Sequence, residues 1–198
     1  WTRFFDFPSA AQIMGKVEEL RLARAPATPK EAKARDYFTD TVLKTAKGDN
    51  VRFYTDVLKD HVVLMNFMYA NCGDACPMIT HTLNQVRKEL GDRFGSEVRF
   101  VSLSVDPKRD TPADLQRYAV KYNAVHPEWL FLTGDTPKME TVLKKLGSYT
   151  PDPEDHTTAM IIGNARTDRW RKVRPDAPPA VIAAELRSLM AEQVATAQ

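Results

Sequence analysis

From about residue 40 onward, short apolar segments alternate with segments that begin at a proline, and this alternation constrains the fold more than any other feature. The apolar segments have the continuous hydrophobic character of strands buried on both faces: VVLMNFM (62–68), VRFVSLSV (98–105) and WLFLT (129–133). A proline at a helix start follows each of them: Pro77, Pro112 and Pro137. Strands joined by helices build an α/β sheet, so we predict a central sheet with helices on both faces.

The two ends of this alternating region predict antiparallel additions to the sheet. TVLKTAK and VRFYTD flank Gly48-Asp49-Asn50, a pattern typical of a β-hairpin. Near the C-terminus, TTAMIIGN and DRWRKV follow one another without a helix between them. We therefore predict a mixed sheet that is preceded by one hairpin and finished by another, with a last helix from Pro179 to about Glu192.

The first 35 residues differ from the rest in composition. WTRFFDFPSAAQIMGKVEELRLARA carries apolar residues at helical spacing, and APATPKEAKAR resembles a linker. We predict an N-terminal helical extension and linker over residues 1–35 and one α/β domain over residues 36–198. The longest apolar run, Val62–Ala70, is far shorter than the roughly 20 residues of a membrane span. With 28 basic and 26 acidic residues, the chain has no basic run that favours nucleic acid.

Both cysteines of the chain lie in one short segment, YANCGDACPMITH (69–81). Cys72 and Cys76 fall between the end of a predicted central strand and the helix that Pro77 opens. Because a proline disfavours helical torsions in the residue before it, we predict Cys76 as a helix cap. A helix N-terminus favours the thiolate, and ligand sites in open α/β sheets lie at the carboxyl ends of strands. The pair is therefore predicted to be redox-active or metal-binding, and a plain structural disulfide is the alternative.

Two thiolates need at least one further ligand to complete a metal site, and the histidines are the candidates. Three of the four are interpreted as surface or packing residues: His61, His81 and His126. His156 differs, because it follows the polar loop YTPDPED and precedes a predicted strand that a thioredoxin-like layout would place beside the cysteine loop. Soft sulfur with imidazole favours copper, and Asp155 is predicted to orient the imidazole. Met78 is interpreted as a packing residue.

The ordered set of motifs resembles the Sco/SenC copper chaperone family, whose fold is thioredoxin-like. The likeness is carried by FMYANCGDACP with its C-x3-C-P motif, by SVDPKRDTP, by FLTGD and by the Asp-His pair before a late strand. It covers about residues 40 to 190. The resemblance implies that Cys72, Cys76 and His156 bind one copper ion, as Cu(I) and/or Cu(II), and that Asp74 matches the family's acidic loop residue.

The resemblance also implies a role and a location. Proteins of this family help to assemble the copper centre of cytochrome c oxidase, by passing copper or by reducing the cysteines of that site. The expected partners are therefore a client cuproprotein and a thioredoxin-like reductant. The expected location is the periplasm or the mitochondrial intermembrane space, with a membrane tether upstream of residue 1. The chain departs from the family pattern at Gly73, where a proline is usual, and at Ala70, where a threonine is common.

Two other functions remain open at this level. A thiol–disulfide oxidoreductase without metal would use the same two thiolates, Cys72 and Cys76, as a redox-active pair. An interaction domain with an inert disulfide would need neither thiol. Copper titration, disulfide turnover and alkylation of both cysteines distinguish these possibilities.

Overall fold

The computed structural model describes residues 9, 14 and 29–195 of the chain. Two compact units are distinguished, Trp1–Lys33 and Ala34–Gln198. The predicted N-terminal amphipathic helix lies, apart from residues 9 and 14, outside the described residues. Where a linker was expected, Pro29–Phe38 forms helix α2. Its sequence, PKEAKARDYF, is rich in strong helix formers and carries its proline at the first position, where no helical hydrogen bond is lost.

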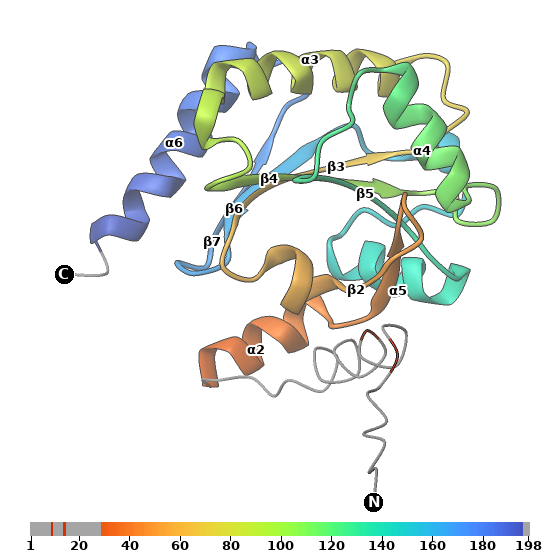
Figure 1. Cartoon of the computed structure of the whole chain (residues 1–198), viewed down its shortest axis with the longest axis horizontal. Coiled ribbons are helices and arrows are strands. Elements are labelled where there is room, and N and C mark those ends of the chain that lie inside the picture. Colours follow the sequence, from red (N-terminus) through yellow and green to blue (C-terminus); the bar gives the residue numbers. More distant parts are fainter. Residues whose placement is uncertain (1–8, 10–13, 15–28, 196–198) are drawn as a thin grey trace, which may run out of the picture. The chain divides into compact units, whose positions relative to one another are not determined.

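A seven-stranded mixed sheet forms the centre of the second unit, in the order β2-β1-β5-β4-β3-β6-β7 (Figure 1). The strands are β1 (Val42–Thr45), β2 (Asn50–Arg52), β3 (Val62–Met68), β4 (Val98–Ser104), β5 (Trp129–Thr133), β6 (Met160–Asn164) and β7 (Arg169–Val173). Strands β3, β4 and β5 are parallel, whereas β6 pairs antiparallel with both β3 and β7. This arrangement confirms the predicted mixed sheet with a hairpin at each end.

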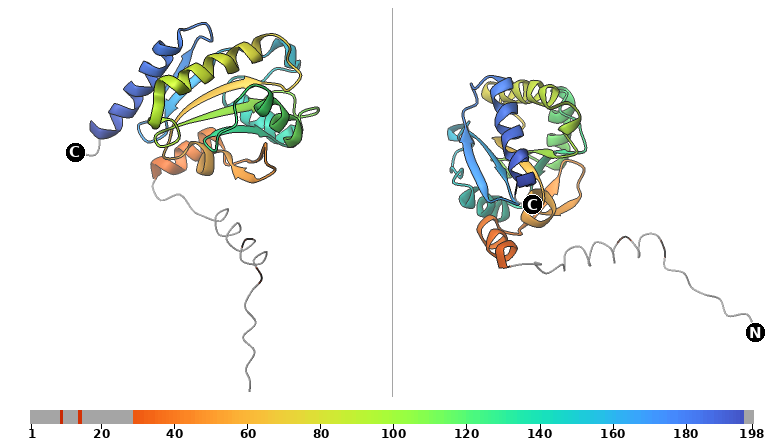
Figure 2. Two further views of the ribbon diagram at one scale, coloured as in Figure 1. Left: turned by 45° about the horizontal axis from the view of Figure 1, so that its top comes forward. Right: turned by 90° about the vertical axis from the view of Figure 1, so that its left-hand side faces the viewer.

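Helices cover both faces of the sheet, as predicted. The bounds are α3 (Ala75–Leu90), α4 (Pro112–Lys121), α5 (Thr136–Lys145) and α6 (Pro179–Ala195). Buried residues of α3, α4 and α6 share one hydrophobic core, and those of α5 and of the π-helical segment η1 (Phe53–Leu58) share the other. Figure 2 shows α3 and α6 side by side on the first of these faces. Among the described helices, none has the length and hydropathy of a membrane span.

Strand β3 shows why the sequence of the central strands is continuously apolar. All seven of its residues are buried, and successive side chains enter opposite cores, with Leu64 in one and Met65 in the other. Its one strongly polar residue, Asn66, accepts a hydrogen bond from the Ser102 hydroxyl at 2.7 Å, and the Trp129 indole donates to the same hydroxyl at 3.0 Å. The buried amide oxygen is therefore satisfied within the sheet.

The second strand of the first hairpin is shorter than predicted. Strand β2 ends at Arg52, and the next residues form η1 instead of continuing the strand. The Asp56 carboxylate accepts hydrogen bonds from the backbone amide of Arg52 at 2.8 Å and from its guanidinium at 2.9 Å and 3.1 Å. This pairing over four residues favours a helical turn over an extended chain.

Candidate metal centre

The cysteine segment connects the carboxyl end of β3 to the start of α3. Asp74 is the N-cap of α3, so the helix begins at Ala75 and Cys76 is its second residue. The prediction that Cys76 caps the helix was therefore wrong. Pro77 occupies the third helical position, where its missing N–H has no partner within the helix in any case, so the helix can start ahead of the proline.

A buried carboxylate anchors the start of this segment. The Asp110 oxygens accept hydrogen bonds from the backbone amide of Ala70 at 3.1 and 3.2 Å, and one of them accepts from the Ser104 hydroxyl at 2.6 Å. Burial raises the pKa of Asp110, although these hydrogen bonds act against the rise. Sequence reasoning did not single out Asp110 as a site residue. The SVDPKRDTP segment contains it, but nothing local indicates its partner, 40 positions earlier.

The two thiols are free and close together, and both are buried. The backbone amide of Cys76 donates to the sulfur of Cys72 at 3.4 Å. Burial acts to raise the pKa of Cys72, but hydrogen bonds outweigh it and lower that pKa; they come from the Cys76 thiol, from the Asp74 and Cys76 amides and from the Tyr69 hydroxyl. Burial, together with the hydrogen bond to Cys72, raises the pKa of Cys76 to about 12. The pair is thus asymmetric, because Cys72 loses its proton more readily than Cys76.

His156 lies against this pair. Its Nε2 atom is 3.9 Å from the sulfur of Cys76, and its Nδ1 atom is 2.7 Å from the carbonyl oxygen of Pro153. Because a carbonyl only accepts, Nδ1 carries the proton and Nε2 presents its lone pair to the sulfur. The Tyr69 ring packs edge-on against the imidazole at 5.6 Å between centroids. The sequence predicted that Asp155 orients this ring; the Pro153 carbonyl does so instead, and Asp155 is exposed.

The donor set suits a soft metal ion. An ion about 2.3 Å from a sulfur and about 2.0 Å from a nitrogen holds these two ligands about 3.5–4 Å apart, which matches the separation of His156 Nε2 and Cys76 Sγ. Thiolate sulfur and imidazole are ligands of copper. Within residues 29–195, however, no three or more His, Cys, Asp or Glu side chains are already placed to enclose a metal ion.

The remaining candidates from the sequence have other surroundings. His61 Nδ1 is 2.7 Å from the Lys59 carbonyl oxygen, and the His126 ring packs on Phe94 at 4.6 Å between centroids. His81 is exposed on α3. The interpretation of Met78 as a packing residue was wrong, because its side chain is 67% exposed.

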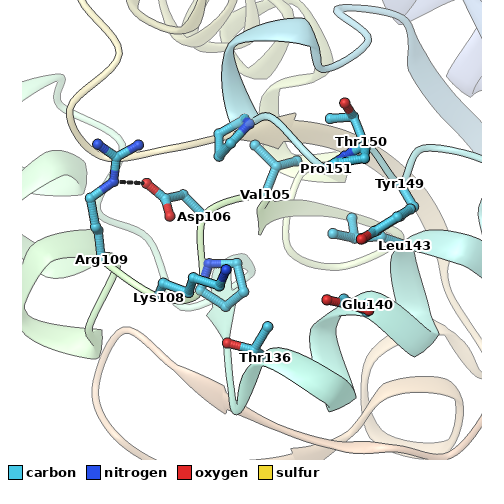
Figure 3. A pocket seen from close by; sticks show the side chains of 12 residues that line it. Val105, Asp106, Lys108, Arg109, Thr136, Glu140, Leu143, Tyr149, Thr150 and Pro151 are labelled. Atoms are coloured by element: carbon cyan, nitrogen blue, oxygen red, sulfur yellow. Dashed lines mark hydrogen bonds and ion pairs between the residues drawn. The ribbon is translucent and has the colours of Figure 1, made fainter.

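A cavity of about 430 Å³ adjoins the site (Figure 3). It is lined by the segment after β4, by α5 and by the segment from Tyr149 to Pro153. Figure 3 shows Asp106 and Arg109, which form an ion pair, across the cavity from Tyr149 and Pro151. Pro153 connects the cavity to the site, since its carbonyl holds His156. Neither cysteine lines the cavity, so the thiols lie outside it.

Comparison with known proteins identifies the family of the chain. The SCO1/SenC family model matches residues 33–191. The SCO1 protein homolog of Bacillus subtilis (strain 168) is 34% identical over 109 residues, which are 54% of this chain and 55% of that protein. The chain spans about half the length of the curated relatives it matches.

Solved structures show the same fold. The copper-bound structure of Bradyrhizobium japonicum ScoI is 26% identical, with a TM-score of 0.64 over 75% of this chain and 96% of that one. The structure of BsSco, described as a member of the Sco family of cytochrome c oxidase assembly proteins with a disulfide switch, is also 26% identical; its TM-score is 0.63 over 75% of this chain and 90% of that one. By its sequence and its thioredoxin-like fold, the chain belongs to the SCO1/SenC family.

Proposed function

We propose that this protein binds a copper ion through Cys72, Cys76 and His156 and delivers it to a client cuproprotein, the copper subunit of cytochrome c oxidase or one like it. The observation that carries the proposal is the approach of the His156 Nε2 lone pair to the Cys76 sulfur, at 3.9 Å, beside a second sulfur. Copper-bound Bradyrhizobium japonicum ScoI and the oxidase-assembly role described for the family of BsSco support it.

The three ligands have different roles in this proposal. Two thiolate sulfurs favour Cu(I), and the imidazole adds a ligand that also suits Cu(II). Cys72 is poised to bind first, because its pKa is lowered. Cys76 must lose its proton to the solvent when copper binds, since its pKa is raised to about 12 in the free protein. Asn71, Gly73 and Asp74 are exposed around the sulfurs, which leaves a route for a client's ligands to replace those of this chain one at a time.

Copper titration of the reduced protein tests the proposal. We expect one tightly bound Cu(I) per chain, measured anaerobically against a competing chelator, and its loss in the Cys72→Ser/Cys76→Ser double variant. A chaperone must also release its ion, so the loaded protein should transfer copper to the soluble copper domain of an oxidase. Equal Cu(I) affinity in the double variant and the unmodified chain would rule out the cysteine site.

A second candidate function, reduction of a client disulfide, is favoured by the asymmetry of the two thiols. The Cys72 thiolate would attack one sulfur of the client disulfide and release the other as a thiolate. Cys76 would then lose its proton to His156 Nε2, 3.9 Å away, and would attack the Cys72 sulfur. The client leaves with two thiols, the protein holds a Cys72–Cys76 disulfide, and a thioredoxin-like reductant returns the two electrons.

A turnover assay separates the two functions. A reductase regenerated by thioredoxin would reduce a client disulfide many times per protein molecule without copper. The control is the Cys76→Ser variant, which retains Cys72 and should stop at the mixed disulfide. Tight copper binding without any disulfide turnover would leave only the chaperone role.

The compartment is part of the proposal. A yeast relative is named as mitochondrial and a structural neighbour from Bacillus anthracis as a lipoprotein. We propose that the domain works in the periplasm or in the mitochondrial intermembrane space, held to a membrane by a tether upstream of residue 1. Fractionation of cells that produce the natural protein, with detection of this domain in each fraction, tests the location.

A further inference from the structure

The exposed face of α3 carries a row of polar and sulfur-containing side chains that leads away from the cysteine loop. Asp74, Met78, His81 and Gln85 are all exposed, and their spacing of four, three and four residues places them on one face of the helix. The opposite face of α3 is buried and contains Cys76, Ile79 and Leu83. The row is therefore next to the thiols in the sequence but separate from them on the helix.

Met78 has no packing role that explains its position. Its side chain is 67% exposed, whereas methionine is among the residues most often buried. Helical side chains lean toward the N-terminus of their helix, so Met78 extends toward the cysteine loop at Asp74 and Ala75. The Asp74 carboxylate caps α3 without a side-chain hydrogen bond and adds a negative charge on the same face.

His81 lies one turn after Met78 and presents a nitrogen lone pair. The Gln85 amide nitrogen is 3.0 Å from His81 Nε2. An amide nitrogen only donates, so Nε2 is the acceptor and the proton is on Nδ1. The Nε2 lone pair accepts a single, exposed hydrogen bond from Gln85. A metal ion can replace this hydrogen bond at a small cost in free energy. A thioether and an imidazole three residues apart on a helix are close enough to share one ion.

We propose that Met78 and His81 form a second, surface-exposed site for Cu(I), outside the Cys72–Cys76–His156 set. Thioether sulfur is a soft ligand that selects Cu(I), and imidazole accepts the same ion. With two neutral ligands and full access to solvent, the site binds more weakly than a thiolate pair and exchanges copper faster. The copper chemistry rests on the proposed function, but the site does not require the cysteines to bind copper.

Anaerobic titration with Cu(I), buffered by a chelator of moderate affinity, tests this site. The reduced chain should bind two equivalents, one tight and one weak. The Met78→Leu/His81→Gln double variant should keep the tight equivalent and lose the weak one, and each single variant should weaken it by about tenfold or more, as for other losses around metal sites. Met14→Leu is the matched control, because Met14 is also exposed, at 69%, and should leave both equivalents unchanged.

A variant without cysteines tests the surface site independently of the proposed function. In Cys72→Ser/Cys76→Ser the weak equivalent should persist, and NMR should show the His81 ring resonances shifting as Cu(I) is added. If the Met78→Leu/His81→Gln variant keeps both the tight and the weak copper equivalent unchanged, the surface site is overturned and the proposed function is not. If the unmodified chain binds only the weak equivalent of copper and no tight one, the proposed function is overturned and the surface site is not.

Discussion

The Nε2 atom of His156 lies 3.9 Å from the sulfur of Cys76, across 80 positions of the chain. The sheet produces this approach. Strand β6 pairs antiparallel with β3, so the residues that precede β6 lie beside the carboxyl end of β3. The cysteine segment starts at that same end of β3. Two loops distant in sequence thus meet because their strands are hydrogen-bonded neighbours running in opposite directions.

Replacement of His156 by alanine should weaken Cu(II) binding more than Cu(I) binding. The imidazole is the nitrogen ligand of the proposed set, whereas the two sulfurs that favour Cu(I) remain. We expect the Cu(II) affinity to fall by about 100-fold or more, beyond what loss of an outer partner costs. Competition titration and the visible absorption spectrum of the Cu(II) protein measure the change.

His61→Ala is the matched control for this experiment. His61 is half-buried and precedes β3, at the end of the strand opposite the cysteine segment, with its Nδ1 2.7 Å from the Lys59 carbonyl oxygen. Its loss should leave the Cu(II) affinity and spectrum unchanged. If both variants behave alike, His156 is not the third ligand.

Alkylation of the reduced protein should discriminate between the two cysteines by pH. The pKa of Cys72 is lowered, so its thiolate should react at a lower pH than that of a free cysteine. The pKa of Cys76 is raised to about 12, so this thiol should resist alkylation through the neutral and mildly alkaline range. Peptide mass spectrometry after timed exposure to iodoacetamide gives both rates. Equal rates at pH 7 would contradict the asymmetry.

Much of this fold follows from local sequence patterns. Strands β3, β4 and β5 were predicted because each is buried between two layers of helices and is therefore continuously apolar. The start of α4 was predicted from Thr111-Pro112, and the structure adds a capping box in which the Thr111 and Asp114 side chains each bond the other's backbone amide. Such signals lie within a few residues of the element they determine.

What the sequence did not predict depends on partners that are distant in the chain or on competition between local rules. Asp110 anchors Ala70 from 40 positions away, and no nearby pattern indicates that contact. Helix α3 starts before Pro77 and includes Cys76, because a proline disfavours but does not forbid a helical residue before it. The exposure of Met78 could not be read from its apolar character alone.

Replacement of Asp110 by alanine should destabilise the fold and loosen the cysteine segment. It leaves the buried Ser104 hydroxyl without its acceptor, at about 1–3 kcal/mol, and also removes the acceptor of the half-buried Ala70 amide. Because the pKa of Asp110 is raised in the folded state, its contribution to stability is greatest below the unfolded pKa and declines as the pH rises. The loss measured by urea denaturation should therefore be larger at pH 4 than at pH 7.

The exposed Asp92 provides the control for Asp110. Asp92→Ala should change the free energy of unfolding by less than about 0.5 kcal/mol, as for other surface substitutions. A loss of stability in Asp110→Ala that does not exceed that of Asp92→Ala would show that the buried carboxylate does not anchor the segment.

Gly163 should not tolerate even a methyl group. A Cβ there would overlap the indole ring of Trp170, which lies over the strand and packs on Phe38 at 4.5 Å between ring centroids. We expect Gly163→Ala to cost about 1–3 kcal/mol, typical of overpacking, in the free energy of unfolding. Gly73→Ala is the control, since a Cβ at Gly73 meets nothing within 4 Å. Equal stability of the two variants would contradict the close approach of Trp170.

Replacement of Tyr69 by phenylalanine should raise the pKa of Cys72 without unfolding the protein. Burial and the adjacent Cys72 thiolate raise the pKa of Tyr69 to about 12, so its hydroxyl keeps its proton and donates to that thiolate. Without this donor, the thiolate is less stable relative to the thiol. The pH at which Cys72 is half-maximally alkylated should therefore move upward, while Tyr149→Phe, at a 38% exposed tyrosine, should leave it unchanged. An unmoved profile in Tyr69→Phe would mean that backbone amides and the Cys76 thiol alone lower the pKa of Cys72.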